Sequence, residues 1–143
     1  MATPRASFYF NVRRRDHALC QLIDKALRQG LAIGVAADSE ADVHALDLLL
    51  WEVPPTGFLP HCKVGHALAD VTPVLLDHRL DRLPQRDVLF NWRHDIAADP
   101  QRFGRVIEIV ARDDEIGREA ARQRVAAYKR AGFTVDFTDM ATR

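Results

Sequence analysis

Apolar residues recur along the chain with two different periods, which predict strands and helices in alternation. Residues 7–12 are aromatic and β-branched, and residues 31–37 form a continuous apolar run, so both segments predict buried strands. Between them, apolar positions from Leu19 to Leu27 recur at intervals of three and four. This spacing predicts a helix that Asp16 caps and Gly30 ends.

A second helix follows the second strand. Ser39 is a suitable N-cap, and the apolar positions continue to Trp51. The order strand, helix, strand, helix predicts a βαβ unit with parallel strands. Pro54 and Pro55 then end the helix, and we expect residues 52–70 to be irregular. Loops of this length are uncommon in compact domains and are often functional.

The rest of the chain continues the alternation. Strands are expected at residues 71–76, 87–92 and 105–111, a long helix at residues 113–130, and a final edge strand at residues 133–137. Gly132 is expected to end the long helix. The complete pattern predicts one three-layer α/β domain over residues 1–143, with a mostly parallel sheet.

Composition narrows the possible functions. The 20 basic and 20 acidic residues give a formal net charge of zero, which argues against a protein that functions mainly by binding phosphates. Cys20 lies within a helical apolar pattern, so we expect a buried free thiol rather than a disulfide. No apolar segment resembles a signal peptide or a membrane span, and we expect a cytoplasmic protein.

The turns that follow the first two strands do not favour a nucleotide cofactor. Residues 11–16 and 36–39 contain no glycine, although dinucleotide and P-loop sites need glycine where the backbone approaches phosphate. Residues 13–15 are three consecutive arginines at a helix start, where they could hold an anion, but a solvated charge run is the favoured interpretation. We expect no cofactor.

Catalytic and metal-binding patterns are also weak. His61, Cys62 and His66 are close in sequence and could form a metal site with Cys20, but they lack the paired spacing of zinc ligands. The favoured interpretation is a loop histidine whose ring caps backbone groups, rather than a metal ligand. No serine lies in a nucleophile-elbow context, so we expect no enzyme. The alternative is a small-molecule- or nucleotide-binding α/β enzyme with an atypical site.

One candidate surface lies around the two prolines. Trp51 ends the second helix, and Phe58, Leu59 and Pro60 follow on a proline-stiffened segment. Exposed aromatic residues on such a segment are suitable anchors for a partner. The alternative is that Trp51 and Phe58 complete the core beneath the loop.

A second candidate surface lies on the long helix. Helical geometry places Arg118, Arg122, Val125 and Lys129 on one stripe. A buried face is expected on the opposite side, at Ile116, Ala120, Ala127 and Ala131. Helix-dipole complementarity explains why bases follow acids along the axis, but not why the bases share a stripe with an apolar residue. Such a stripe suits a short acidic peptide with an apolar anchor.

An ordered set of segments along nearly the whole chain resembles the chi subunit family of DNA polymerase III holoenzyme. These segments are Phe8-Tyr9, Leu46–Trp51, Phe58–His61, Asp87–Asn91 and Ala121–Arg124 leading into Tyr128–Phe133. The resemblance implies a Rossmann-like fold without its cofactor. It also implies a non-catalytic adaptor of the clamp-loader assembly that acts in DNA replication.

The same resemblance implies two partners. Chi proteins pair with the psi subunit through residues that match Trp51 and Phe58, and some use this surface for an iron-sulfur helicase. They bind the acidic, phenylalanine-ended C-terminal tail of single-stranded DNA-binding protein through residues that match Arg118, Arg122 and Val125. Better-known members carry an aromatic and a basic residue where this chain has Val125 and Ala126. Lys129 is a candidate to replace part of that charge.

Overall fold

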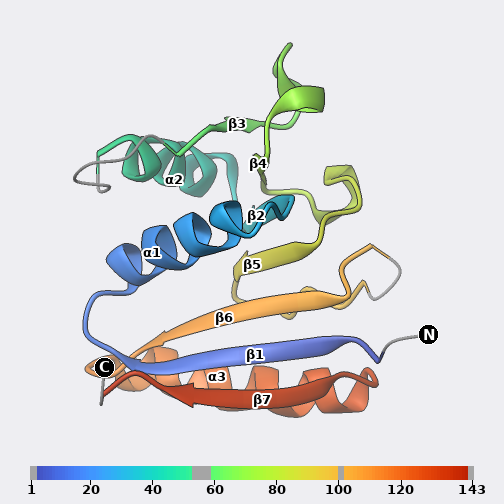
Figure 1. Cartoon of the computed structure of the whole chain (residues 1–143). Helices are drawn as coiled ribbons and strands as arrows, with labels where there is room; N and C mark the ends of the chain where they lie inside the picture. Colours follow the sequence, from blue (N-terminus) through green and yellow to red (C-terminus); the bar gives the residue numbers. More distant parts are fainter. Residues whose placement is uncertain (1–2, 53–58, 100–101, 142–143) are drawn as a thin grey trace.

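The computed structural model describes residues 3–52, 59–99 and 102–141. The described strands form one seven-stranded sheet in the order β3-β4-β2-β5-β6-β1-β7, and every neighbouring pair is parallel (Figure 1). The strands are β1 (Arg5–Val12), β2 (Ile33–Ala37), β3 (His61–Lys63), β4 (Val74–Asp77), β5 (Val88–Trp92), β6 (Arg105–Ala111) and β7 (Thr134–Asp139). The predicted α/β class and parallel sheet are confirmed.

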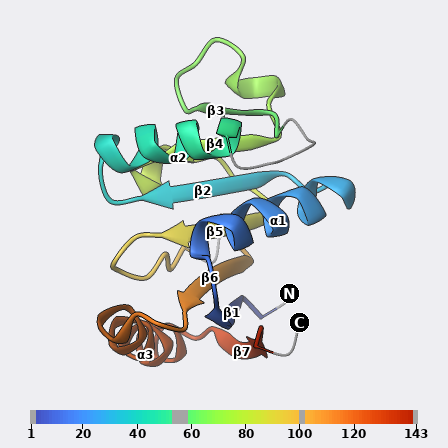
Figure 2. The same cartoon turned by 90° about the vertical axis from the view of Figure 1, so that its left-hand side faces the viewer.

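Three α-helices within the described residues cover the two faces of this sheet. They are α1 (Arg15–Arg28), α2 (Glu40–Glu52) and α3 (Glu115–Arg130), and two short 3₁₀ turns occur at Ala69–Val71 and Leu80–Arg82. Side chains of α1 and α2 pack into one apolar cluster, whereas those of α3 pack into a second cluster on the other face. Figure 2 shows α1 and α3 with β5 and β6 between them. None of the described helices has the length and apolarity needed to cross a membrane.

The helix ends follow the predicted capping residues with one exception. The Ser39 hydroxyl accepts a hydrogen bond from the Asp42 amide, as predicted. The start of α3 is capped by the Asp114 carboxylate, which accepts a hydrogen bond from the Gly117 amide and was not singled out from the sequence. Gly132 follows α3 with φ +90°, a conformation that glycine adopts without strain. The prediction for Asp16 is wrong, because Arg14 occupies the N-cap of α1 without a side-chain cap. Asp16 lies in the first turn of α1, where a negative charge interacts favourably with the helix dipole.

The stretch expected to be irregular contains a strand. His61–Lys63 form β3, which pairs with Val74–Leu76 of β4 at one edge of the sheet. The prediction missed β3 because three residues are too few to show the alternation of a strand. Backbone pairing with β4, rather than a local pattern, holds this segment. The segment between α2 and β3 includes residues 53–58, which lie outside the described residues.

Candidate functional site

The rotation of α3 on the sheet differs from the sequence prediction. The buried side chains of the helix are Ala121 and Tyr128, whereas Ile116 is 86% exposed. The expected buried face, which combined Ile116 with three alanines (Ala120, Ala127 and Ala131), is therefore wrong. The buried stripe instead passes through residues 117, 121, 124 and 128. It includes an arginine and a tyrosine, which an apolar pattern assigns to the surface.

A buried polar cluster accounts for this rotation. Glu108 of β6 has no exposed surface, and its carboxylate accepts hydrogen bonds from Arg124 Nε at 3.1 Å, Tyr128 OH at 2.7 Å and Asn91 Nδ2 at 2.6 Å. Burial raises the pKa of the Glu108 carboxyl, and the Arg124 charge and the three donors oppose this rise. Because an unpaired buried carboxylate is costly, Arg124 and Tyr128 must face the sheet.

This rotation leaves a basic flank on α3, which we define as Arg118, Arg122, Val125 and Lys129. Val125 is half-buried and packs against the second core cluster, while Arg122 and Lys129 are exposed. The opposite flank of the helix, with Ile116 and Ala120, lines a cavity beside β5. The basic flank therefore faces the β7 side of the sheet, as helical geometry requires. The structure brings the four predicted residues together.

Among the described residues, the two arginines of the basic flank form ion pairs only with glutamates of the same helix. Arg118 pairs with Glu115 at 3.1 Å, and Arg122 pairs with Glu119 at 2.9 Å. The Arg122 and Glu119 side chains are each 61% exposed. Exposed pairs of this kind contribute about 0–1 kcal/mol, so an incoming carboxylate can replace the glutamate at little cost. The guanidinium groups are accordingly available to an anionic partner.

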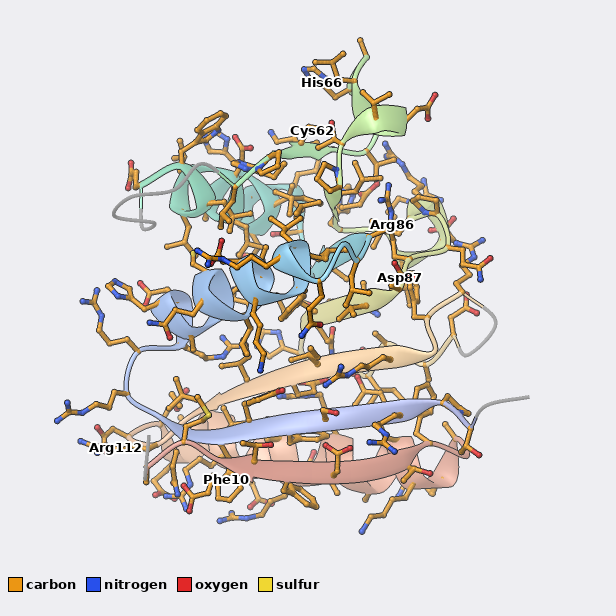
Figure 3. All side chains as sticks on the ribbon, viewed as in Figure 1. Phe10, Cys62, His66, Arg86, Asp87 and Arg112 are labelled. Carbon is orange, nitrogen blue, oxygen red and sulfur yellow. The ribbon has the colours of Figure 1, made fainter. Side chains whose placement is uncertain are left out.

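An exposed aromatic residue that the sequence analysis did not single out lies near this flank. Phe137 on the edge strand β7 is 55% exposed, and it pairs in register with Phe8 of β1. Phe8 contacts Tyr128 of α3 with ring centroids 6.0 Å apart, so Phe137 faces the side of the sheet that α3 covers. Its ring also contacts Phe10, which lies on β1 in the lower part of Figure 3. An apolar surface thus borders the basic flank. The alternation of residues 133–137 indicated a strand, but it could not show which strand or helix lay beside it.

The candidate surface around Trp51 and the two prolines is only partly within the described residues. Trp51 at the end of α2 is 53% exposed, and its ring lies 4.9 Å from that of His61. Trp51 therefore does not complete the core. Pro60 is half-buried, and Phe58 lies outside the described residues. The assignment of Leu59 to this surface is corrected, because its side chain is 2% exposed and packs into the first core cluster.

His61 has a structural role beneath Trp51. Its Nδ1 lies 2.5 Å from the Leu59 carbonyl oxygen, and its Nε2 lies 3.1 Å from the Asp47 carbonyl oxygen. The expected contacts of this ring with backbone groups are thus confirmed, although the residue belongs to β3 rather than to a loop. Cys62 follows it on the same edge strand, near the top of Figure 3. Within the described ranges, no three His, Cys, Asp or Glu residues are placed to hold a metal ion.

The comparisons with known proteins agree on one family. The family profile described as "DNA polymerase III chi subunit, HolC" matches residues 3–136. Three proteins named DNA polymerase III subunit chi are similar to this chain. The Escherichia coli protein is 28% identical over 85% of this chain and 82% of its own length. The Haemophilus influenzae protein is 29% identical over 84% and 83%, and the Pseudomonas aeruginosa protein is 32% identical over 83% and 82%.

These matches cover the same strands and helices that carry both candidate surfaces. The family profile begins before β1 and ends within β7, so it includes α3 and the end of α2. The chain belongs to the DNA polymerase III chi subunit family, and it is an accessory subunit of the replication machinery.

Proposed function

We propose that this chain is a non-catalytic adaptor that links the DNA polymerase III clamp-loader assembly to single-stranded DNA-binding protein. The observation that carries the proposal is the basic flank of α3. Its cations surround the half-buried Val125, and the exposed Phe137 lies on the adjacent edge strand. This arrangement complements a peptide that combines acidic residues with an apolar end.

In this proposal, the acidic C-terminal tail of single-stranded DNA-binding protein lies along the basic flank. Arg118 and Arg122 exchange their glutamate partners for tail carboxylates, and charge-assisted hydrogen bonds form in their place. Lys129 adds a third cation one turn beyond Val125. The terminal phenylalanine of the tail contacts the apolar surface at Val125 and Phe137.

The test is a titration of a labelled tail peptide with the wild-type protein and with Arg122→Ala. Loss of the charge-assisted contacts should weaken binding roughly ten- to a hundred-fold, which corresponds to about 1.5–3 kcal/mol. Arg130→Ala is the matched control, because Arg130 is an exposed arginine of the same helix outside the basic flank. It should bind the peptide like the wild type.

Equal affinities of the wild type and Arg122→Ala would show that the tail does not use this flank. Equal losses in Arg122→Ala and Arg130→Ala would show that only the total charge of the helix matters. A wild-type protein that does not bind the peptide would remove the link to single-stranded DNA-binding protein.

We propose that the surface around Trp51 holds the partner that joins the chain to its assembly. Trp51 is a large, exposed aromatic residue at a helix end, which is typical of an interface anchor. The psi subunit is the first candidate because the family resemblance implies it, and an iron-sulfur helicase is the alternative. Phe58 and Pro60 are assigned to this surface with Trp51. Co-purification of each candidate with the wild type and with Trp51→Ser distinguishes them.

A further inference from the structure

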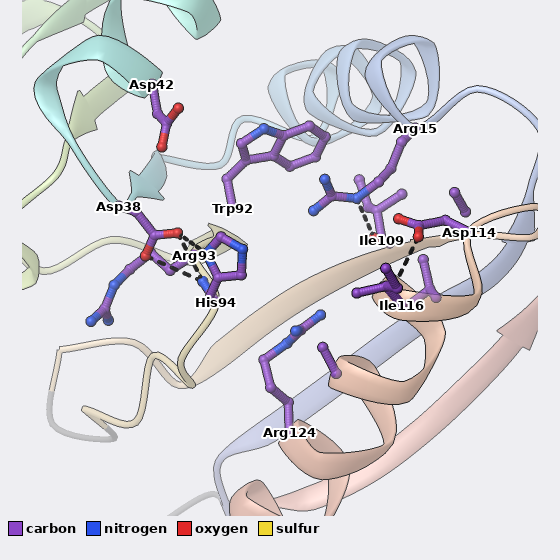
Figure 4. Close-up of a pocket in the computed structure, with 14 residues that line it drawn as sticks. Arg15, Asp38, Asp42, Trp92, Arg93, His94, Ile109, Asp114, Ile116 and Arg124 are labelled. Atoms are coloured by element: carbon purple, nitrogen blue, oxygen red, sulfur yellow. Dashed lines mark hydrogen bonds and ion pairs between the residues drawn. The ribbon is translucent and has the colours of Figure 1, made fainter.

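A cavity of about 310 Å³ lies at the carboxyl ends of the parallel strands (Figure 4). Its lining includes Asp38 after β2, Arg93 after β5 and Ala111 at the end of β6. From β2 the chain enters α2 on one face of the sheet, whereas β6 leads to α3 on the other face. Ligands of open α/β sheets bind in the crevice where neighbouring connections diverge in this way. The cavity occupies that position.

Two arginines from opposite faces of the sheet converge on this cavity. Arg15 begins α1, and its Nε donates to the Ile109 carbonyl oxygen at 2.7 Å. Arg124 lies in α3, and its Nε donates to the Glu108 carboxylate at 3.1 Å. In both cases the inner nitrogen is bound to the fold, and Figure 4 shows both guanidinium groups directed into the space between the two helices. The terminal NH₂ groups of both arginines, which form a fork on each guanidinium, are therefore available to a ligand in the same cavity.

Arg15 has no carboxylate partner among the described residues. Its interactions there are the bond to Ile109 and a stacking contact with Trp92, in which its Cζ lies 3.7 Å from the ring centroid. Burial lowers the pKa of Arg15, and the nearby Arg124 charge lowers it further, although acidic residues partly oppose this effect. A partly buried cation that faces a second cation favours an anion between them.

The carboxylates that line the cavity are engaged elsewhere or lie away from this pair. Asp38 bonds to the amide and ring of His94, and Asp114 caps the Gly117 amide. Asp42 is an exposed residue of the first turn of α2. None of the three forms an ion pair with Arg15 or Arg124 within the described part of the chain.

We propose that this cavity binds the phosphate group of a small phosphomonoester, with Arg15 and Arg124 as its two cationic partners. Two guanidinium forks supply four N–H donors for the oxygens of a phosphate group, whereas a carboxylate needs only one fork. The cavity is at the small end of the range for ligand sites. The glycine-free turn at residues 11–16 also argues against a dinucleotide. A small phosphorylated ligand fits both limits.

This site is separate from the proposed tail-binding surface. The cavity contacts the Ile116 and Ala120 side of α3, whereas the basic flank lies on the β7 side. Arg122→Ala should therefore leave phosphate binding unchanged. The two proposals can fail independently of each other.

The experiment is a nuclear magnetic resonance titration of the full-length protein with inorganic phosphate at constant ionic strength. The Nε–H resonances of Arg15 and Arg124 are followed, and each is assigned by its Arg→Lys variant. We expect saturable shifts of both resonances and of the Trp92 indole N–H. Arg15→Lys keeps the charge but removes the fork, so it should weaken phosphate binding about ten-fold or more. Arg14→Gln, which changes the exposed neighbouring arginine, should bind phosphate like the wild type.

A parallel titration with acetate separates phosphate recognition from general anion binding. Acetate should bind at least about ten-fold more weakly, because one carboxylate cannot use both forks. Shifts that do not saturate, or that chloride reproduces, would mean an adventitious ion only and would overturn the proposal. Unchanged affinity in an Arg15→Lys variant that melts like the wild type would also overturn it. So would acetate binding as strong as phosphate binding.

Discussion

Tyr128 of α3 and Glu108 of β6 are joined by a hydrogen bond of 2.7 Å within the core, although they lie in a helix and in a strand that are separate in the sequence. The same Tyr128 hydroxyl accepts a hydrogen bond from the Ala97 amide at 3.1 Å. One side chain therefore fixes the rotation of α3 and also holds the segment that follows β5. Both proposed sites on α3 depend on that rotation.

The variant Tyr128→Phe should lower the free energy of unfolding by about 1.5–3 kcal/mol, because it leaves a buried carboxylate with one donor fewer and the Ala97 amide without its acceptor. Urea denaturation would measure this as a lower midpoint with an unchanged slope. Tyr9→Phe is the matched control, since Tyr9 is half-buried and its hydroxyl has no hydrogen bond within the described residues. A Tyr128→Phe midpoint as close to the wild type as that of Tyr9→Phe would show that the cluster does not stabilise the fold.

The same pair explains what the sequence could not predict about α3. The extent of the helix follows from local residues: it was predicted at residues 113–130 and is observed at Glu115–Arg130. Its rotation depends on Glu108, which is distant in sequence and sits inside an apolar strand. Ile116 is apolar but exposed, and Arg124 is charged but nearly buried, with an 11% exposed side chain. The periodicity of apolar residues therefore cannot predict the exposure of Ile116 or the burial of Arg124, because both depend on contacts with distant residues.

The sheet shows the same division between local and distant information. The strand at residues 105–111 was predicted with the bounds that the structure has, because a long buried strand shows its character in its own residues. β3 is visible only through its pairing with β4. Phe137 was recognised as part of an edge strand, but its closeness to the basic flank depends on the packing of α3 against β7. The residues of these surfaces are brought together by the fold, and their spacing in the sequence does not indicate that they are neighbours.

The two cysteines should differ in reactivity toward a thiol reagent. Burial raises the pKa of the Cys20 thiol to about 11, and the side chain is 4% exposed, whereas Cys62 is only half-buried. A raised pKa lowers the thiolate fraction at any pH below it, and the thiolate is the reactive form. At about pH 8, one thiol of the native protein, that of Cys62, should therefore react quickly with the reagent. Cys20 should react only when the protein unfolds. The Cys62→Ser variant keeps only Cys20 and should react slowly in its native state. Rapid reaction of both thiols of the native wild type, or of the single thiol of the variant, would contradict the buried position of Cys20.

Trp51→Ser should abolish co-purification of psi or of the alternative helicase while changing stability little. The residue is 53% exposed, and its contact with the His61 ring is of a kind that contributes about 0.5–1.5 kcal/mol. The expected loss in the free energy of unfolding is therefore small, and thermal melting would measure it. The neighbouring Leu50 is 1% exposed, so Leu50→Ala provides a contrast with an expected loss of about 2–5 kcal/mol.

These two variants separate a surface role from a core role. If Trp51→Ser destabilised the protein as much as Leu50→Ala, then Trp51 would serve the core. If Trp51→Ser kept both its stability and its partner, then the anchor would lie elsewhere on the molecule.

The apolar half of the proposed tail site can be tested apart from the ionic half. Phe137→Ser removes a ring that is 55% exposed, and the loss of its contact with the terminal phenylalanine should weaken tail binding by about 1 kcal/mol, or roughly five-fold. Val71→Ser is a matched control, because Val71 is an apolar residue that is 78% exposed in the 3₁₀ turn before β4. This control should bind the tail like the wild type.

Salt distinguishes the two halves because it screens charges and leaves apolar contacts intact. Between about 50 and 300 mM salt, the wild-type affinity should fall, since exposed ion pairs weaken as the Debye length shortens. Phe137→Ser should show the same slope at a lower affinity, whereas Arg122→Ala should show a shallower slope, because one ion pair with the tail is gone. A peptide titration at several salt concentrations measures all three slopes. A shallower slope in Phe137→Ser would mean that the ring acts by positioning the cations, and an unchanged affinity would remove Phe137 from the site while leaving the role of Arg122 intact.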